Sequence, residues 1–283
     1  MDDSGGFGAP PPPPPPSAGG GGSIPQRGLG DILSASFEVY KANATNLILI
    51  VAIVVVPLSL ISHLFTGVVF KPTTQTVTFA GQTISTTTTR SFGTFILASL
   101  IAAAITVIIS AALQAALVRG AALATVGDPI DVEASYRYGF RRFGSVVWIS
   151  LLVGIVVAIG FILLVIPGII FLTMLSVAIP ALVVENRRGT DAMGRSWNLV
   201  KGHFWHVLGT IVVAAIIAGV IGAIFGLLGG SNWFLQWIFG SIGSIITAPF
   251  SALVAILLYV DLRARTEALT GDRLRADLST SAS

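Results

Sequence analysis

The sequence contains no cysteine, so disulfides, thiolate metal sites and cysteine nucleophiles are excluded. Histidine is almost as scarce, because His63, His203 and His206 are the only three in the chain. No carboxylate lies beside them at the spacing of a metal-binding motif. We therefore expect neither a metal site nor a cofactor.

Charged residues are also few: they make up 10% of the chain, against about 25% in soluble proteins. Hydrophobic residues account for 54%, and the mean hydropathy is +0.88. The sequence pI near 9.6 reflects a net charge of only +3, and the basic residues flank hydrophobic stretches. This composition indicates an integral membrane protein whose partners are membrane lipids rather than nucleic acid.

The first 29 residues lack the features of a secretory signal, because Asp2 and Asp3 replace its basic segment and no apolar segment follows. Glycine, serine and the unbroken proline run Pro10–Pro16 dominate this region, and such a composition cannot form a packed core. We predict a disordered cytoplasmic tail over residues 1–29. It serves either as a solubilising spacer or as a docking site for a proline-binding partner.

Apolar stretches of bilayer length follow, since a transmembrane helix needs about 20 such residues. The six predicted spans are Asn46–Phe70, Phe92–Leu117, Gly144–Ile166, Ile169–Val184, Val207–Leu228 and Leu235–Tyr259. Only Pro167-Gly168 separates the third span from the fourth, so we predict a tight helical hairpin that turns at this dipeptide. Pro57, Pro180 and Pro249 lie inside spans, and we expect each to kink its helix.

The basic residues are distributed unevenly across these spans. Of the 16 Lys and Arg, only Lys71 and Arg90 fall on one side, and the other fourteen fall on the opposite side. The positive-inside rule makes the richer side cytoplasmic. We therefore predict a multi-pass protein of the cell membrane with both termini in the cytoplasm.

One sizeable loop, residues 71–91, lies on the external side. Within it Val77, Phe79 and Ile84 alternate with polar neighbours around Ala80-Gly81. This alternation predicts a β-hairpin.

A short pattern precedes each pair of spans: an aspartate followed by a serine-aromatic pair. Its three copies are Asp31 with Ser36-Phe37, Asp131 with Ser135-Tyr136, and Asp191 with Ser196-Trp197. In each copy the apolar positions share one helical face, which favours an amphipathic helix in the plane of the interface, and the aspartate is the expected N-cap. Such helices either sense or lift lipid headgroups or simply anchor the loops.

The predicted fold is therefore all-α. It is a polytopic membrane protein with six transmembrane helices arranged as three hairpins, each preceded by a cytoplasmic interfacial amphipathic helix. We assign the membrane domain to residues 30–268 and a polar cytoplasmic tail to residues 269–283.

Several short motifs extend this interpretation. They are the Pro167-Gly168 hairpin, Glu185, the set Arg195, Ser196, Leu199, Lys201, Gly202 and Trp205, and the ending Leu258, Tyr259, Asp261, Leu262, Arg263, Arg265 and Glu267. Together they resemble the glycerophosphoryl diester phosphodiesterase membrane domain family over roughly Gly28 to Glu267. Members of that family either stand alone or are fused to a phosphodiesterase barrel. A barrel of about 250 residues has no room here, so the resemblance implies no phosphodiesterase activity.

Polar residues inside the spans offer little chemistry. No Asp, Glu, Lys or Arg lies mid-span, whereas a pump or proton-coupled carrier usually retains such groups. The most polar groups near the hydrocarbon are His63 and Gln114. His63 lies near the external end of its span and is either structural or a proton relay, and the Gln114 amide either bridges two helices or contacts a substrate. We find no nucleophile-base pair or ligand set that would make the chain an enzyme.

The candidate site is a polar cluster at the cytoplasmic boundary. Its residues are Glu185, Arg195, Lys201, Asp261 and Arg263. Opposite charges attract strongly near a low-dielectric slab, so the two carboxylates could pair with these arginines or with Arg119 and clamp the helix ends. Alternatively, Arg195 and Lys201 could hold a headgroup phosphate.

The fifth span carries small residues at every fourth position, namely Ala218, Gly222, Gly226 and Gly230, a surface on which another helix can pack closely. We expect that helix to belong to the same chain, with a membrane-protein partner or a second copy as the alternative. The predicted function is that of a non-enzymatic accessory or structural protein of the cell membrane or of lipid organisation. The alternative is a transporter or channel for lipid or small solutes.

Overall fold

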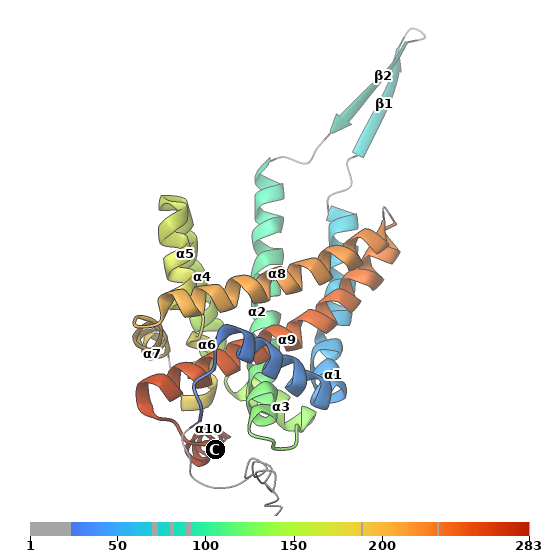
Figure 1. The fold of residues 1–283 in the computed structure, drawn as a ribbon. Helices are drawn as coiled ribbons and strands as arrows, with labels where there is room; N and C mark the ends of the chain where they lie inside the picture. The colour runs from blue at the N-terminus through green and yellow to red at the C-terminus, as the bar shows by residue number, and fades with distance from the viewer. Residues whose placement is uncertain are drawn as a thin grey trace, which may run out of the picture.

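The computed structural model describes residues 24–69, 73–79, 82–88, 92–187, 189–230 and 232–282. Over these ranges the chain is mainly helical, with one two-stranded sheet (Figure 1). The elements are α1 (Leu29–Val69), β1 (Thr73–Phe79), β2 (Gln82–Thr88), α2 (Phe92–Thr125), α3 (Val132–Arg141), α4 (Phe143–Leu163), α5 (Val165–Met174), α6 (Ala178–Glu185), α7 (Thr190–Val200), α8 (Phe204–Gly229), α9 (Trp233–Glu267) and α10 (Gly271–Ala282). Residues 1–23 of the predicted N-terminal tail lie outside the described residues.

The first unit contains α1, the β-hairpin and α2. α1 combines the expected interfacial helix with the first span, and the two segments meet at Asn43, whose backbone is non-helical (φ −122°, ψ 17°). The helix continues past Pro57 without another such break. β1 and β2 pair antiparallel, with Val77 opposite Ile84, as the hairpin prediction required.

The second unit contains α3 and a tight hairpin of α4 and α5. The predicted turn was wrong: the chain reverses at Leu164, whose backbone is extended, and Pro167 lies in the first turn of α5. Proline is tolerated there because the N–H it lacks would have no helical partner. Gly168 serves packing instead, since a Cβ at this position would lie 2.5 Å from the Phe161 ring.

The fourth predicted span is broken rather than continuous. α5 ends at Met174, three turn residues follow, and α6 begins at Ala178. Pro180 explains the break, because its ring clashes with the carbonyl of Ser176, four residues earlier. Proline also has no backbone N–H to donate a hydrogen bond to that carbonyl. The expected kink at Pro180 is therefore a full interruption.

The third unit contains α7, α8 and α9. The side chain of Asn232 caps α9 by accepting hydrogen bonds from the Phe234 and Leu235 N–H groups at 2.9 and 3.4 Å. α9 continues through Pro249 and is 35 residues long. In Figure 1, α8 and α9 run side by side and cross α1 and α2 obliquely rather than lying parallel to them.

The three serines of the repeated pattern are all buried, but Ser36 and Ser135 bond to a carbonyl four residues earlier, whereas Ser196 bonds to Met174 of α5. Ser36, Ser135 and Ser196 are each 0% exposed. Each hydroxyl donates to a backbone carbonyl, at 2.7, 2.8 and 2.7 Å respectively. The aromatic residues that follow them differ, because Phe37 is exposed whereas the Tyr136 hydroxyl bonds to the main chain of α1.

The aspartates of the pattern are less uniform. Asp131 is an N-cap as predicted, since its carboxylate accepts from the Ala134 N–H at 3.1 Å. The N-cap prediction was wrong for Asp31 and Asp191, which lie inside the first turns of α1 and α7. A glycine, Gly189, occupies the N-cap position of α7.

Five segments among the described residues are long and apolar enough to cross a membrane. They are Leu29–Ile61, Phe143–Leu163, Val165–Glu185, Phe204–Gly229 and Trp233–Glu267. These helices are compatible with a multi-pass membrane protein. In α2 a shorter apolar stretch, Ile109–Thr125, was found.

Residues 252–264, in the second half of α9, are almost all buried. As a whole, α9 contacts α1, α2, α6, α7 and α8. Leu253, Leu257 and Tyr259 are almost fully buried, and so are Asp261 and Arg263. The change from apolar to charged sequence on this helix therefore takes place inside the protein.

The segment expected as a polar tail contains a packed helix. α10 buries Leu274 and Leu278, which are four residues apart and so share one helical face, and it contacts α6. The polar composition hid this face because only two of its twelve residues are large and apolar.

The small residues of the fifth span do not pack within the described chain. A Cβ built at Gly222 or Gly226 would meet nothing within 4 Å, and both residues are exposed on α8. The expected intramolecular contact was therefore wrong for these two glycines. α8 approaches α9 elsewhere, for example where Gly229 contacts Gln236.

Candidate functional site

The five predicted site residues divide between two clusters. Glu185, Arg195 and Arg263 meet in one, which we call the Glu185 network; its members are Glu185, Arg195, Tyr259, Arg263, Glu267 and Asp277. Asp261 belongs to a second, the Asp261 cluster, with Arg27, His206 and Arg265. Lys201 is exposed just after α7 and has no described ion pair with either cluster.

Glu185 is the hub of the first network because it ends α6 facing α7 and α9. Its Oε1 accepts hydrogen bonds from Arg195 Nε at 2.8 Å and from the Tyr259 hydroxyl at 2.6 Å. Its Oε2 accepts from Arg187 Nε at 2.6 Å. One carboxylate thus joins the loop after α6 to α7 and α9.

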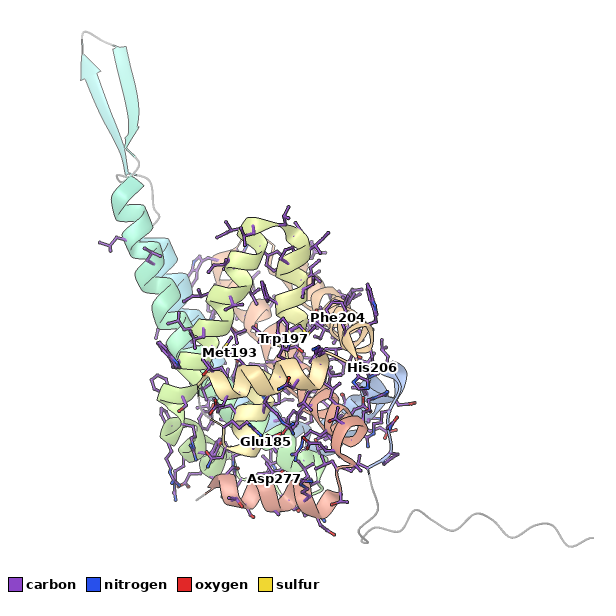
Figure 2. All side chains as sticks on the ribbon, turned by 90° about the vertical axis from the view of Figure 1, so that its left-hand side faces the viewer. Glu185, Met193, Trp197, Phe204, His206 and Asp277 are labelled. Atoms are coloured by element: carbon purple, nitrogen blue, oxygen red, sulfur yellow. The ribbon has the colours of Figure 1, made fainter. Side chains whose placement is uncertain are left out.

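Arg263 extends the network from α9 to α10. Its Nε lies 3.2 Å from Glu267 and 3.6 Å from Glu185, and its Nη1 donates to Asp277 Oδ2 at 2.7 Å. The Arg263 side chain is only 3% exposed. Asp277 lies on α10 (Figure 2), and it lines a polar basin together with Glu185. Four helices are therefore connected through largely desolvated charges.

Arg195 supplies the second cation of the network. It bonds to Glu185 and also pairs with Glu267, one turn beyond Arg263 on α9. Burial by itself lowers the pKa of the Arg195 guanidinium, but its bonds to Glu185 and Glu267 outweigh burial and raise that pKa above its usual value. The cation is therefore held in its charged form.

Asp261 faces another side of α9 and has different partners. Its Oδ1 accepts from the Arg27 N–H at 2.7 Å, and its Oδ2 accepts from Arg265 Nε at 2.7 Å. His206 Nε2 of α8 lies 3.2 Å from Oδ2. Arg265 also donates to the Arg27 carbonyl at 2.6 Å. The cluster thus fixes the chain just before α1 against α9 and α8.

Helix geometry explains the separation. Tyr259, Arg263 and Glu267 are four residues apart, so they lie on one face of α9. Asp261 is two residues from Arg263, which turns it by about 200° onto the opposite face. The prediction that Asp261 pairs with Arg195, Arg263 or Arg119 was therefore wrong.

Arg119 belongs to a third contact, which secures the end of α10. Its guanidinium lies 4.5 Å from the centre of the Tyr138 ring and donates to the Ser281 hydroxyl at 3.2 Å. The Tyr138 hydroxyl donates to the Val183 carbonyl at 2.9 Å, and burial raises the pKa of this phenol. Arg119 is thus held by a cation–π contact rather than by a carboxylate.

A polar basin of about 300 Å³ opens beside the Glu185 network. It is lined by Glu185, Arg187, Arg195, Arg263, Glu267, Arg273 and Asp277. Four arginines and three carboxylates face this basin. The carboxylates already pair with Arg195 and Arg263, and Glu185 also pairs with Arg187. The geometry therefore favours a clamp over a phosphate site.

The described residues include no group of three or more His, Asp or Glu that could hold a metal ion. His206 and Asp261 form a pair, but the same carboxylate oxygen already receives Arg265. Among the described hydrogen bonds, no hydroxyl donates to the His206 ring.

Some residues of the two clusters were not selected from the sequence. Tyr259, Glu267 and Arg265 could have been found from their four-residue spacing to Arg263 and Asp261. Asp277 and Arg27 offer no such signal. Arg27, for instance, contacts Asp261 across 234 positions of sequence.

Comparisons of the chain with models of protein families, with curated proteins and with solved structures find no match. The resemblance to the glycerophosphoryl diester phosphodiesterase membrane domain family rests on the short motifs alone and stays a prediction.

Proposed function

We propose that the chain is a non-enzymatic accessory protein of the cell membrane that helps to organise its lipids. The observation that carries this proposal is the Glu185 network, in which buried and partly buried charges on α6, α7, α9 and α10 bind one another. Such a site holds helices in place, and its two central cations, Arg195 and Arg263, are already paired with carboxylates. It supports a structural role over a catalytic one.

The proposed contact with membrane lipids rests on exposed aromatic residues. Phe37, Phe140 and Trp205 are 54%, 68% and 80% exposed, and they lie on or beside the interfacial segments. Lys41 is placed 5.0 Å from the centre of the Phe37 ring. Aromatic and basic side chains together favour the headgroup region of a bilayer. Membrane lipids are therefore the proposed partners.

We further propose six spans in three hairpins, with both termini cytoplasmic. α2 would supply the sixth span. The five tryptophans support this arrangement, because four lie near the ends of proposed spans and Trp197 lies on α7, one of the proposed interfacial helices. Tryptophan is enriched at the two interfaces of a membrane. Trp148, Trp197 and Trp205 would mark the cytoplasmic interface, and Trp233 and Trp237 the external one.

Single cysteines test the topology directly, because the natural chain has none. We expect Thr78→Cys to react with an impermeant maleimide in intact cells. Glu133→Cys and Asp272→Cys occupy exposed positions on α3 and α10 and should react only after permeabilisation. Labelling of Asp272→Cys from outside would contradict the proposed orientation.

The functional proposal is tested in vesicles that contain the purified protein. We expect the protein to raise the fluorescence anisotropy of a headgroup-level lipid probe, and to release no glycerol phosphate from glycerophosphodiesters. Replacing Phe37, Phe140 and Trp205 together with serine should abolish the rise in anisotropy, whereas replacing them with leucine should weaken it less. Catalytic release of glycerol phosphate, or an anisotropy unchanged by the wild-type protein, would refute the proposal.

A further inference from the structure

A cavity of about 540 Å³ lies between α2, α4, α8, α9 and the α5–α6 segment. Its walls are stripes of residues at helical spacing, such as Ser150, Gly154 and Val157 on α4. By the rise of an α-helix, this stripe lies about 10–20 Å from the start of α4. The cavity is therefore at hydrocarbon depth if α4 crosses the bilayer.

Small residues create the space. Seven of the sixteen lining residues are glycine, alanine or serine, so the facing helices cannot fill the volume between them. At Gly154 an added Cβ would meet nothing within 4 Å. A larger side chain there would occupy the cavity without displacing the backbone.

Four polar side chains from four different segments face this space: Gln114, Ser150, Ser176 and Ser251. Ser176 and Ser251 donate to carbonyls of their own segments at 2.8 and 3.0 Å. The Ser150 hydroxyl oxygen is buried and has no partner among the described residues. A buried, unsatisfied hydroxyl is costly, and a rotation of the Ser150 side chain that turns its oxygen toward the cavity would let a ligand's hydrogen-bonding group relieve that cost.

The broken span is a second sign of a binding site. The turn residues that separate α5 from α6 begin with Leu175 and Ser176, and both line the cavity. Pro180 leaves the Ser176 carbonyl without its helical N–H donor. Irregular backbone at membrane depth is tolerated where it is buried in protein or lines a cavity, and broken helices often form the binding sites of membrane proteins.

The lining defines the ligand's chemistry. None of the sixteen lining residues carries a formal charge, and the exposed lining is predominantly apolar. On α6, the almost fully buried Leu182 lies between Ile179, which lines this cavity, and Glu185 of the Glu185 network. A charged headgroup in the cavity would have no ionic partner within reach and would be strongly disfavoured.

The cavity is not fully enclosed. Among its lining residues, Leu172 is 38% exposed, and Gln114 and Ser251 are exposed as well. If the surrounding helices cross the bilayer, this opening faces hydrocarbon, so a ligand dissolved in the membrane can enter laterally. A water-soluble solute has no comparable route along an apolar lining.

We propose that this cavity binds a neutral membrane lipid, with one hydrocarbon chain along the apolar stripes and a hydroxyl or ester carbonyl hydrogen-bonded to Ser150 and Gln114. This inference deepens the proposed lipid-organising function and rests on its membrane assignment. It gives the protein a specific lipid class in place of a general affinity for headgroups.

The test uses the full chain in phosphatidylcholine vesicles that contain a diacylglycerol with a diazirine in one acyl chain. After illumination, mass spectrometry should locate the label on α4 and α9 residues that line the cavity. We expect Gly154→Leu to lower this labelling about tenfold or more, a loss equivalent to about 1.4 kcal/mol of binding free energy. Leucine is a better helix former than glycine, so this variant should remain folded.

Gly240→Leu is the matched control. Gly240 is also a helical glycine with nothing within 4 Å of an added Cβ, but it lies on the exposed part of α9 and does not line the cavity. Its labelling should equal that of the wild-type chain. Equal labelling in the wild-type and Gly154→Leu chains would overturn the proposal.

Ser150→Ala tests the polar contact. It removes a hydroxyl that has no partner in the described protein, so the melting temperature should not fall. Labelling by diacylglycerol should drop about two- to tenfold, as expected for the loss of one hydrogen bond. A variant labelled as strongly as the wild type would show that Ser150 does not bind the lipid.

An anionic lipid probe tests whether the cavity selects neutral lipids. Phosphatidylglycerol with the same diazirine chain should label the cavity about tenfold less than diacylglycerol, because its phosphate cannot be desolvated there. Equal or stronger labelling by phosphatidylglycerol would overturn the neutral-lipid class. If the wild-type protein orders vesicle lipids but Gly154→Leu labels normally, the cavity proposal alone fails and the general function stands.

Discussion

The two faces of α9 bind charge in different ways. On one face, Arg263 is 3% exposed and is surrounded by three carboxylates from α6, α9 and α10. On the opposite face, Asp261 is fully buried, but its partners Arg265 and His206 remain about one-fifth exposed. The first face therefore depends on mutual pairing, whereas the partner side chains of the second can regain contact with water. Position on the helix, rather than the number of charges, determines how much each cluster stabilises the fold.

The two faces also secure different parts of the chain. The Glu185 network fixes α7 and α10, which follow the second and third hairpins. The Asp261 cluster fixes the segment just before α1, through the Arg27 main chain. A defect in one cluster should therefore loosen one end of the chain and leave the other in place.

The largest effect is expected for Arg263→Met. The substitution keeps most of the side-chain volume but leaves Glu185, Glu267 and Asp277 without their shared cation. The free energy of unfolding in detergent should fall by about 3–5 kcal/mol, as for one partner removed from a buried pair. Arg137→Met removes an exposed pair with Glu133 and should cost about 0–1 kcal/mol. Similar losses in the two variants would show that the network is solvated.

A smaller effect is expected for Asp261→Ala, because Arg265 and His206 can be rehydrated. Its melting temperature should fall clearly more than that of Arg273→Ala, whose exposed side chain lies on α10. Limited trypsin digestion supplies a local measurement. Cleavage after Arg27 should accelerate in Asp261→Ala, since both main-chain groups of Arg27 lose an ordered partner. If the two variants melt alike and Arg27 stays protected, the cluster does not hold this segment.

Double substitutions compare the two faces directly. Glu267→Gln and Asp261→Asn alter residues with no shared partner, so their losses of unfolding free energy should add within about 0.5 kcal/mol. Glu267→Gln and Arg195→Gln break the same ion pair, so the double variant should lose less than the sum of the single ones. Strong coupling between Glu267 and Asp261 would mean that α9 transmits strain between its faces.

The smallest effect is expected for Lys201→Ala. Its side chain is exposed and joins neither cluster in the described contacts, so the free energy of unfolding should change by no more than about 0.5 kcal/mol. The same thermal melts provide the measurement. A loss of several degrees would show that Lys201 has a role that its position does not explain.

Local patterns anticipated much of the fold. The apolar stretches located the helices now seen as α4, α8 and α9 to within a few residues of one or both ends, and the alternation around Ala80-Gly81 anticipated the β-hairpin. The Pro167-Gly168 turn failed because proline is as compatible with the first turn of a helix as with a reversal of the chain. Leu164, where the chain does reverse, carries no turn signal.

The candidate site was anticipated only in part. Glu185, Arg195 and Arg263 were correctly brought together because each ends or follows an apolar segment, and such ends gather at one level of a membrane protein. Asp261 was assigned to the same group because the prediction considered only its position along the helix axis. It did not consider which face of the helix Asp261 occupies. Asp277 was missed because a polar segment gives no sign of where it packs.

The sequence by itself determined the class of this protein: its low charge, long apolar stretches and absent cysteine permit a membrane protein and exclude thiol chemistry. Composition and helical periodicity are sufficient to assign this class, because whether a segment is buried in an apolar environment is reflected in that segment's own residues. Only the tertiary structure decided that Glu185 reaches α10, that Asp261 holds the chain before α1, and that small residues from several helices leave a cavity beside Ser150. These contacts join segments far apart in the chain, and their geometry arises when the helices pack against one another.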